Sequence, residues 1–156
     1  MYFDKLREEY TRNSEKLYPT SQEHINKLTE KYESLPEAYV EFLELMGGSA
    51  HKLFAGEDIV TNELNDLKKD AEDLLAENNS ACVLRDSDFV FWMSQGCMFC
   101  FFNIFDGSDP AVYLFTEGTP DKFKKVSNYF SEFIWNIYKH PEKAFKEIEQ
   151  EVHYAD

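Results

Sequence analysis

Residues 34–48 read Ser-Leu-Pro-Glu-Ala-Tyr-Val-Glu-Phe-Leu-Glu-Leu-Met-Gly-Gly, and this run carries helix signals at both ends. Ser34 and Glu37 have the spacing of a capping box, in which each side chain satisfies a backbone N–H of the first turn. Pro36 suits that turn because its missing N–H would have no helical partner. The paired glycines favour a helix end, since glycine adopts the left-handed conformation without a steric penalty. The run predicts one short helix from Ser34 to Met46.

Apolar side chains on one face of this helix predict what it packs against. Tyr39, Phe42, Leu43 and Met46 recur with the i, i+3, i+4, i+7 spacing of a buried helical stripe. Residues 81–116 are rich in aromatic and β-branched side chains and are interrupted by short polar turns, so they predict three or four antiparallel strands. We expect the helix to pack on that sheet through Tyr39, Phe42 and Leu43. The stretch 97–105 is apolar on both faces, so either both faces are covered or one presents an aromatic surface.

Helical periodicity flanks the strand region on both sides, which predicts an α+β fold with a mainly antiparallel sheet packed by helices from both ends of the chain. Thr20 and Glu23 suggest a second capping box. The length fits one domain. Within residues 1–156 we expect an N-terminal helical extension at 1–18, a core at 20–138 with helices near 20–32, 62–77 and 130–138, and a C-terminal helix at 141–153.

The order of the motifs resembles one known family. The positions that carry the likeness in the first helix are Leu35, Pro36, Tyr39, Phe42, Leu43, Gly47 and Gly48. They are followed by aromatic segments at 89–91, 101–104 and 111–115 and by a closing segment at 129–134. This pattern resembles the SUKH superfamily, which includes the Smi/Knr-like cell-wall assembly regulators of yeast. The resemblance implies a bacterial immunity protein that binds a cognate polymorphic toxin, often a nuclease, and blocks it without chemistry.

The three cysteines predict buried thiols. Cys97 and Cys100 have the C-x-x-C spacing of redox and zinc sites. In a strand, however, residues three apart point to opposite faces, so the two thiolates could not hold one metal ion. Cys82 is the only other cysteine. We expect no bound metal and no disulfide; a redox or metal site is the alternative, and it requires a non-extended backbone from Cys97 to Cys100.

The charge of the chain limits its partners. Thirty acidic against sixteen basic residues give a net charge of −14, and residues 70–121 contain ten acids and one base. Such a surface repels nucleic acid and anionic lipid, so neither is expected as a direct partner. No apolar run approaches the ~20 residues of a membrane span, and the first residues lack a signal-peptide core, so we expect a cytoplasmic protein. The alternative is that these acids simply occupy ordinary solvent-exposed faces and loops and have no role in binding.

Binding is therefore favoured over catalysis. The four histidines are scattered and no nucleophile or cofactor motif is present, so we predict no catalytic residues, no cofactor and no enzyme activity; a small hydrolase would need a clustered histidine or metal site. We expect an immunity protein that covers the active site of a basic toxin, with a regulatory scaffold that docks a cellular protein as the alternative. The acids that flank the aromatic strands are the predicted partner-binding residues: Asp86, Asp88, Asp106, Asp109 and Glu117.

Overall fold

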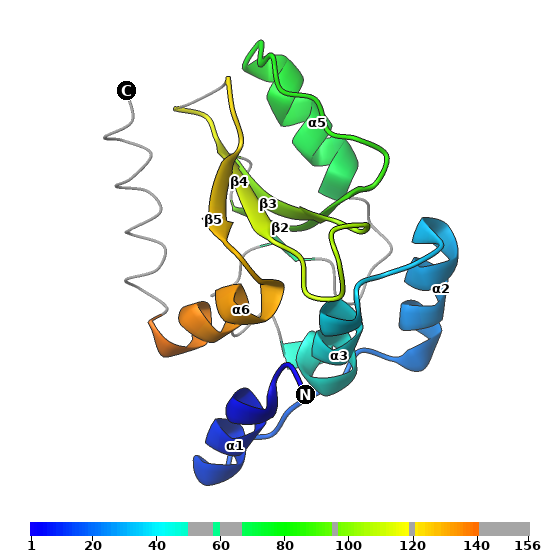
Figure 1. The fold of residues 1–156 in the computed structure, drawn as a ribbon, viewed down its shortest axis with the longest axis vertical. Coiled ribbons are helices and arrows are strands. Elements are labelled where there is room, and N and C mark those ends of the chain that lie inside the picture. The colour runs from blue at the N-terminus through cyan, green and yellow to red at the C-terminus, as the bar shows by residue number, and fades with distance from the viewer. Residues whose placement is uncertain (50–57, 60–66, 95–96, 119–120, 141–156) are drawn as a thin grey trace.

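The fold is the α+β arrangement that the sequence predicts (Figure 1). The computed structural model describes residues 1–49, 58–59, 67–94, 97–118 and 121–140, so the expected helix at 141–153 lies outside the described residues. The helices are α1 (Asp4–Arg12), α2 (Gln22–Tyr32), α3 (Glu37–Met46), α5 (Leu67–Glu77) and α6 (Phe130–Lys139), with a 3₁₀ turn η1 (Gly47–Ser49) after α3. The strands are β1 (Asp58–Ile59), β2 (Asp88–Ser94), β3 (Met98–Asn103), β4 (Val112–Thr116) and β5 (Lys124–Ser127).

The strands form one antiparallel sheet in which each strand lies beside its neighbour in sequence, in the order β1-β2-β3-β4-β5. Phe89 pairs with Phe102 and Trp92 with Cys100, and a bulge lies between Val90 and Trp92. All six residues of β3 are buried. Both faces of the central strand are therefore covered, which decides between the two alternatives that its sequence left open.

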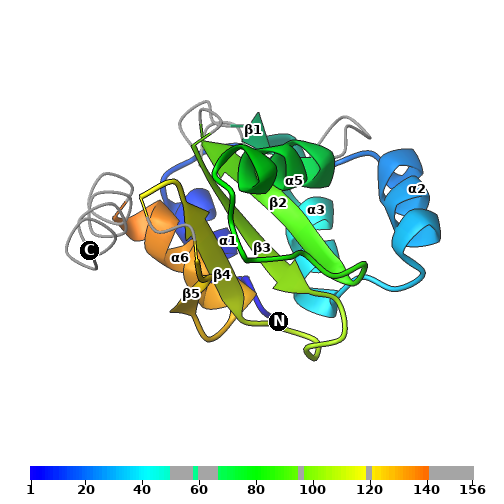
Figure 2. The ribbon, with the colours of Figure 1, turned by 90° about the horizontal axis from the view of Figure 1, so that it is seen from above.

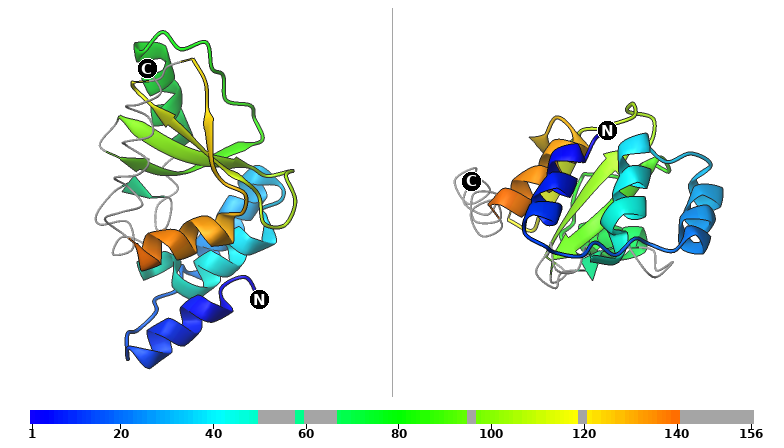
Figure 3. Two further views of the ribbon diagram at one scale, coloured as in Figure 1. Left: turned by 60° about the vertical axis from the view of Figure 1, so that its left-hand side comes forward. Right: turned by 90° about the horizontal axis from the view of Figure 1, so that it is seen from below.

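Helices cover the sheet on both faces. Helix α5 lies against one face beside β2, whereas α3 and α6 lie on the other, with α1 packed beneath them (Figures 2 and 3). The layer between α3, α6 and the sheet is aromatic: Phe102 stacks on Phe89 with ring centroids 5.3 Å apart, and Phe130 meets both Tyr39 and Phe102 edge to face. Tyr39, Phe42 and Leu43 are buried, and the Tyr39 ring contacts those of Phe89 and Phe102 in the sheet, as predicted. The ring of Phe42 instead contacts Phe3 and Phe130, so it packs on the N-terminal segment and α6.

Helix α1 is shorter than the predicted extension because the backbone turns out of the helix at Ser14, whose φ is +55°. It is nevertheless fixed to α6. Tyr10 stacks on Tyr138 with centroids 5.2 Å apart, and Glu9 pairs with Lys139 at 3.3 Å. These contacts join the two ends of the described chain.

Both predicted capping boxes are wrong, for different reasons. Helix α3 begins at Glu37 after Pro36, and no side chain caps it. Instead the Ala38 N–H donates to the Ser108 carbonyl at 2.9 Å, so a loop distant in sequence takes the place of a local cap. In α2 the cap is shifted by one residue: Ser21, and not Thr20, accepts the hydrogen bond from the His24 N–H at 3.3 Å.

The paired glycines serve close packing and not a left-handed helix end. Gly47 is right-handed helical, with φ −54° and ψ −37°, and the chain continues into η1. The Gly48 N–H donates to the Tyr18 carbonyl at 2.7 Å. A Cβ on Gly47 would overlap the Thr20 hydroxyl, and one on Gly48 would lie 2.8 Å from the Tyr18 carbonyl oxygen. The two glycines thus let the segment before α2 pass directly over the end of α3.

Gly48→Ala is expected to lower the free energy of unfolding by about 1–3 kcal/mol, because backbone atoms that cannot rotate away would have to shift. Chemical denaturation measures the loss. Gly107→Asn is the matched control: Gly107 has a φ of +82°, a Cβ added there would meet no atom within 4 Å, and asparagine tolerates that conformation. Equal stability of the two variants would contradict the close approach at Gly48.

Candidate protein-binding surface

Four of the five predicted acids lie at one end of the sheet. Asp86 and Asp88 stand where the chain enters β2, and Asp106 and Asp109 lie in the loop that joins β3 to β4. The antiparallel register brings these two segments together, since Asp88 pairs with Asn103. Glu117 follows β4, and its N–H donates to the Cys97 carbonyl at 3.1 Å, which places it at the opposite end of the sheet. The structure therefore separates Glu117 from the other four.

Asp88 is an internal residue. Its side chain is 2% exposed and accepts hydrogen bonds from the Arg85 N–H at 2.8 Å and from the Asn103 side-chain amide at 3.0 Å. The Arg85 guanidinium pairs with the same carboxylate at 3.3 Å from the solvent side. Buried polar groups need such partners, so this carboxylate holds the turn before β2 in place and does not face an incoming protein.

Asp106 and Asp109 also make internal hydrogen bonds. Asp106 Oδ2 accepts from the Ala111 N–H at 3.2 Å, which closes the β3–β4 loop. Asp109 Oδ1 accepts from the Ser131 N–H at 2.9 Å, and Oδ2 accepts from the Ser131 hydroxyl at 2.5 Å. Helix α6 has no cap from its own sequence, so Asp109 supplies one, and a negative charge near a helix N-terminus is favourable.

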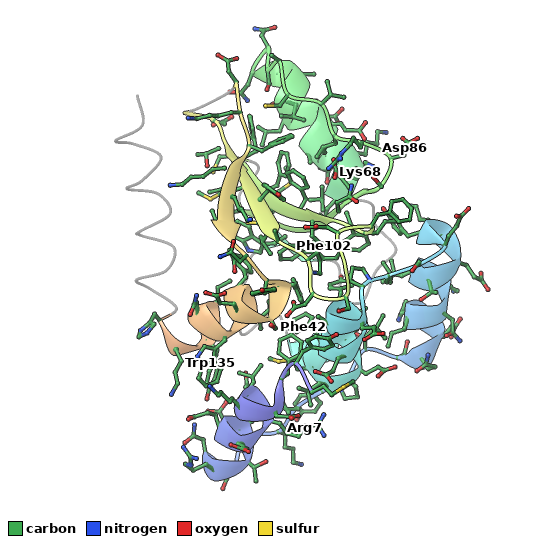
Figure 4. All side chains as sticks on the ribbon, viewed as in Figure 1. Arg7, Phe42, Lys68, Asp86, Phe102 and Trp135 are labelled. Carbon is green, nitrogen blue, oxygen red and sulfur yellow. The ribbon has the colours of Figure 1, made fainter. Side chains whose placement is uncertain are left out.

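Two of the predicted acids, Asp86 and Glu117, are exposed and make no hydrogen bond or ion pair with another side chain among the described residues. Of the set, they have the carboxylates most available to a partner. Asp86 lies close to Lys68 of α5, on the side of the molecule where the chain enters β2 (Figure 4).

Sequence reasoning missed Phe105. It lies two residues after the end of β3 and is 74% exposed, although it was expected at the end of an apolar strand. Phe105 lines a groove of about 550 Å³ with Tyr32 at the end of α2, Lys68 of α5 and Asp86. Phe105 is the most exposed aromatic side chain among the described residues, and a second aromatic ring and a carboxylate line the groove beside it, so we take this groove as a candidate protein-binding site.

The cysteines are free thiols in the structure. Cys100 lies in β3 and is fully buried, and this burial raises the pKa of its thiol well above the ordinary value. The prediction that Cys97 is a buried strand residue is wrong: it stands in the turn just before β3 and is only partly buried, with its Sγ 3.3 Å from the Ser94 carbonyl oxygen. Across the described residues no three His, Cys, Asp or Glu side chains are grouped as metal ligands would be.

Cys100 is expected to react with iodoacetamide far more slowly than Cys82 or Cys97, because thiolate formation and access are both suppressed by burial. Mass spectrometry of the alkylated peptides in buffer and in denaturant measures the difference. Denaturant should bring all three cysteines to similar rates. Rapid labelling of Cys100 in buffer would show that β3 is not enclosed as described.

Comparison with known proteins gives a family match. The chain matches the model of the SMI1/KNR4 family (SUKH-1) over residues 19–136, from the segment before α2 to within α6. No curated protein and no solved structure gives a match. None of the described helices has the length and apolar character that crossing a bilayer requires. The match covers well over half of the chain and contains the sheet, α3 and the groove, and on this basis the chain belongs to the SMI1/KNR4 family (SUKH-1).

Proposed function

We propose that this chain is a cytoplasmic immunity protein that binds a cognate toxin and neutralises it by covering the toxin's active site. The observation that carries the proposal is the charge on a fold of this family: the net charge is −14, and residues 70–121 contain ten acids and only one base. Family membership is compatible with such a role. A nuclease suits the charge best, because an enzyme that binds nucleic acid presents a basic groove.

An immunity protein must associate rapidly with its toxin and dissociate slowly, and it needs no catalytic residues. Complementary charge accelerates association, potentially to about 10⁸–10⁹ M⁻¹s⁻¹, and a desolvated centre then sets the dissociation rate. Exposed acids such as Asp86 supply the first property, and the exposed aromatic surface at Phe105 supplies the second. Asp88 and Asp109 contribute indirectly, since they hold the turns that carry these groups.

A toxin gene beside this one is the first thing to look for, and co-expression with its product tests the proposal. The chain should protect the host and co-purify with the toxin, and the purified chain should inhibit the toxin's activity in proportion to complex formed. Failure to bind or protect would reject immunity and favour the regulatory scaffold, for which a cellular partner would have to be captured and identified.

Neutralising the exposed acids should slow association. Asp86→Asn combined with Glu117→Gln is expected to lower the association rate and weaken its dependence on salt, with little change in stability, because rim charges act mainly on encounter. Glu8→Gln with Glu132→Gln removes the same net charge from α1 and α6 and is the matched control. Stopped-flow kinetics at low and high salt compare the two. Identical slowing in both would assign the effect to net charge alone.

A further inference from the structure

The groove beside Phe105 is built from four separate parts of the chain. Tyr32 and Glu33 end α2, Lys68 stands near the start of α5, Asp86 precedes β2, and Phe105 follows β3. Tyr32 packs against the hydrophobic core, because its ring meets that of the buried Phe89 edge to face with centroids 4.8 Å apart. One wall of the groove is therefore fixed to the hydrophobic core.

Phe105 is held on a rigid turn. Its N–H donates to the Asn103 side-chain oxygen at 2.9 Å, and the Asn103 amide in turn donates to the Ser87 hydroxyl at 2.7 Å and to buried Asp88 at 3.0 Å. The Ile104 N–H donates to the Ser87 carbonyl at 3.0 Å. This network fixes the backbone that leads into Phe105 while its side chain remains 74% exposed. An aromatic side chain presented on a fixed backbone loses little entropy on binding, which is the property of an interface anchor.

The residues that line the groove carry no net charge, so the preference for a basic occupant comes from the net charge of −14 on the whole chain and from the contacts that the groove's lysines already make. Two lysines and two carboxylates line it, but the lysines make internal contacts: the Lys68 amine donates to the Arg85 carbonyl at 2.5 Å, and the Lys31 amine lies 5.6 Å from the centre of the Tyr32 ring. The carboxylates of Glu33 and Asp86 are exposed and meet no partner among the described residues. Glu33 also stands at the C-terminal end of α2, where the helix dipole adds negative potential.

We propose that Phe105 and this groove receive a segment of the partner in which an arginine stands beside an apolar side chain. The apolar side chain packs on Phe105 and Tyr32, and the guanidinium reaches the carboxylates of Glu33 and Asp86. Arginine fits better than lysine because its planar group stacks on aromatic rings and pairs with two carboxylate oxygens at once. The inference rests on the proposed function in taking the partner to be a basic protein, and it adds where that protein is anchored.

A peptide probe tests the groove without the toxin. Acetyl-Leu-Arg-Leu-Arg-amide is titrated to millimolar concentration into the ¹⁵N-labelled chain, with acetyl-Leu-Glu-Leu-Glu-amide as the charge-reversed control. The basic peptide should shift the amide signals of Tyr32, Asp86 and Phe105, and the acidic one should not. Phe105→Ala should abolish the shifts, whereas Tyr129→Ala, which removes another exposed aromatic side chain, should leave them intact. Absence of shifts at these residues with wild type, or equal shifts with both peptides, overturns the inference.

A toxin identified beside the gene provides the second arm. Phe105→Ala should weaken its binding about 30-fold or more, mainly through faster dissociation, while Tyr129→Ala binds like wild type. Thermal melting should show both variants as stable as wild type, because both side chains are largely exposed. If wild type binds the toxin and Phe105→Ala binds equally well, the anchor is wrong and the proposed function stands. If wild type binds no such toxin, the proposed function fails, and the peptide shifts alone decide whether the groove takes a basic segment.

Discussion

Phe42→Ala should lower the free energy of unfolding by about 3–5 kcal/mol, the range for removal of a fully buried aromatic side chain. Phe42 of α3, labelled in Figure 4, is 3% exposed. Its ring centroid lies 6.0 Å from that of Phe3 in the N-terminal segment and 5.6 Å from that of Phe130 in α6. The alanine variant would leave a cavity where three separate segments of the chain meet. Chemical denaturation followed by circular dichroism measures the loss.

Tyr129→Ala is the control for this prediction, since Tyr129 immediately precedes Phe130 but is 55% exposed. It should unfold almost like wild type. If Phe42→Ala also unfolded like wild type, the described packing of α3 against the N-terminal segment and α6 would be wrong.

Asp88→Ala should be the most damaging single change of a polar residue described above. It removes the acceptor of the Arg85 N–H and of the Asn103 amide, and each buried donor left unpaired costs about 1–3 kcal/mol. The Arg85 guanidinium is 70% exposed and would be rehydrated, so it adds little to the loss. We therefore expect a fall of more than about 2 kcal/mol in the free energy of unfolding, together with weaker protection from hydrogen exchange at the amides of residues 85 and 105.

Asp86→Ala, two residues earlier, is the matched control because its carboxylate is exposed. It should leave stability and hydrogen exchange nearly unchanged. Equal stability of the two variants would mean that Asp88 lies at the surface and that the network supporting Phe105 does not form.

The fold could be predicted largely from periodicity. The apolar stripe of α3 and the run of aromatic residues from 89 to 115 specify buried faces directly, and the structure confirms a helix packed on an antiparallel sheet. The helix ends could not be predicted as well. Capping motifs describe local partners, but the Ala38 N–H finds its acceptor in Ser108, far away along the chain. Similarly, the need for Gly48 comes from the Tyr18 carbonyl, which no local pattern reveals.

The candidate site was harder to predict than the fold. An aspartate that accepts hydrogen bonds inside the protein and one that faces solvent look the same in sequence, so Asp88 and Asp109 could not be separated from Asp86. What distinguishes them is Asn103 and Ser131, residues that approach only after the sheet and α6 have formed. Phe105 could not be recognised as exposed from the sequence because it continues an apolar run that predicts a buried strand. Its side chain is exposed because β3 ends at Asn103.

In the β3–β4 loop some residues are needed for folding, whereas another has a side chain that faces solvent. Ser108 and Asp109 satisfy the first turns of α3 and α6, so replacing Asp109 removes the acceptor of the Ser131 N–H and loosens a helix far from it in sequence. Phe105, a few positions earlier, has a largely exposed side chain on the same loop. Substitutions at position 105 should therefore change stability little, whereas those at Asp109 remove a helix cap and should cost about 0.5–2 kcal/mol. A lineage of such proteins could therefore exchange one partner for another by changing the residue at position 105 while Ser108 and Asp109 stayed the same.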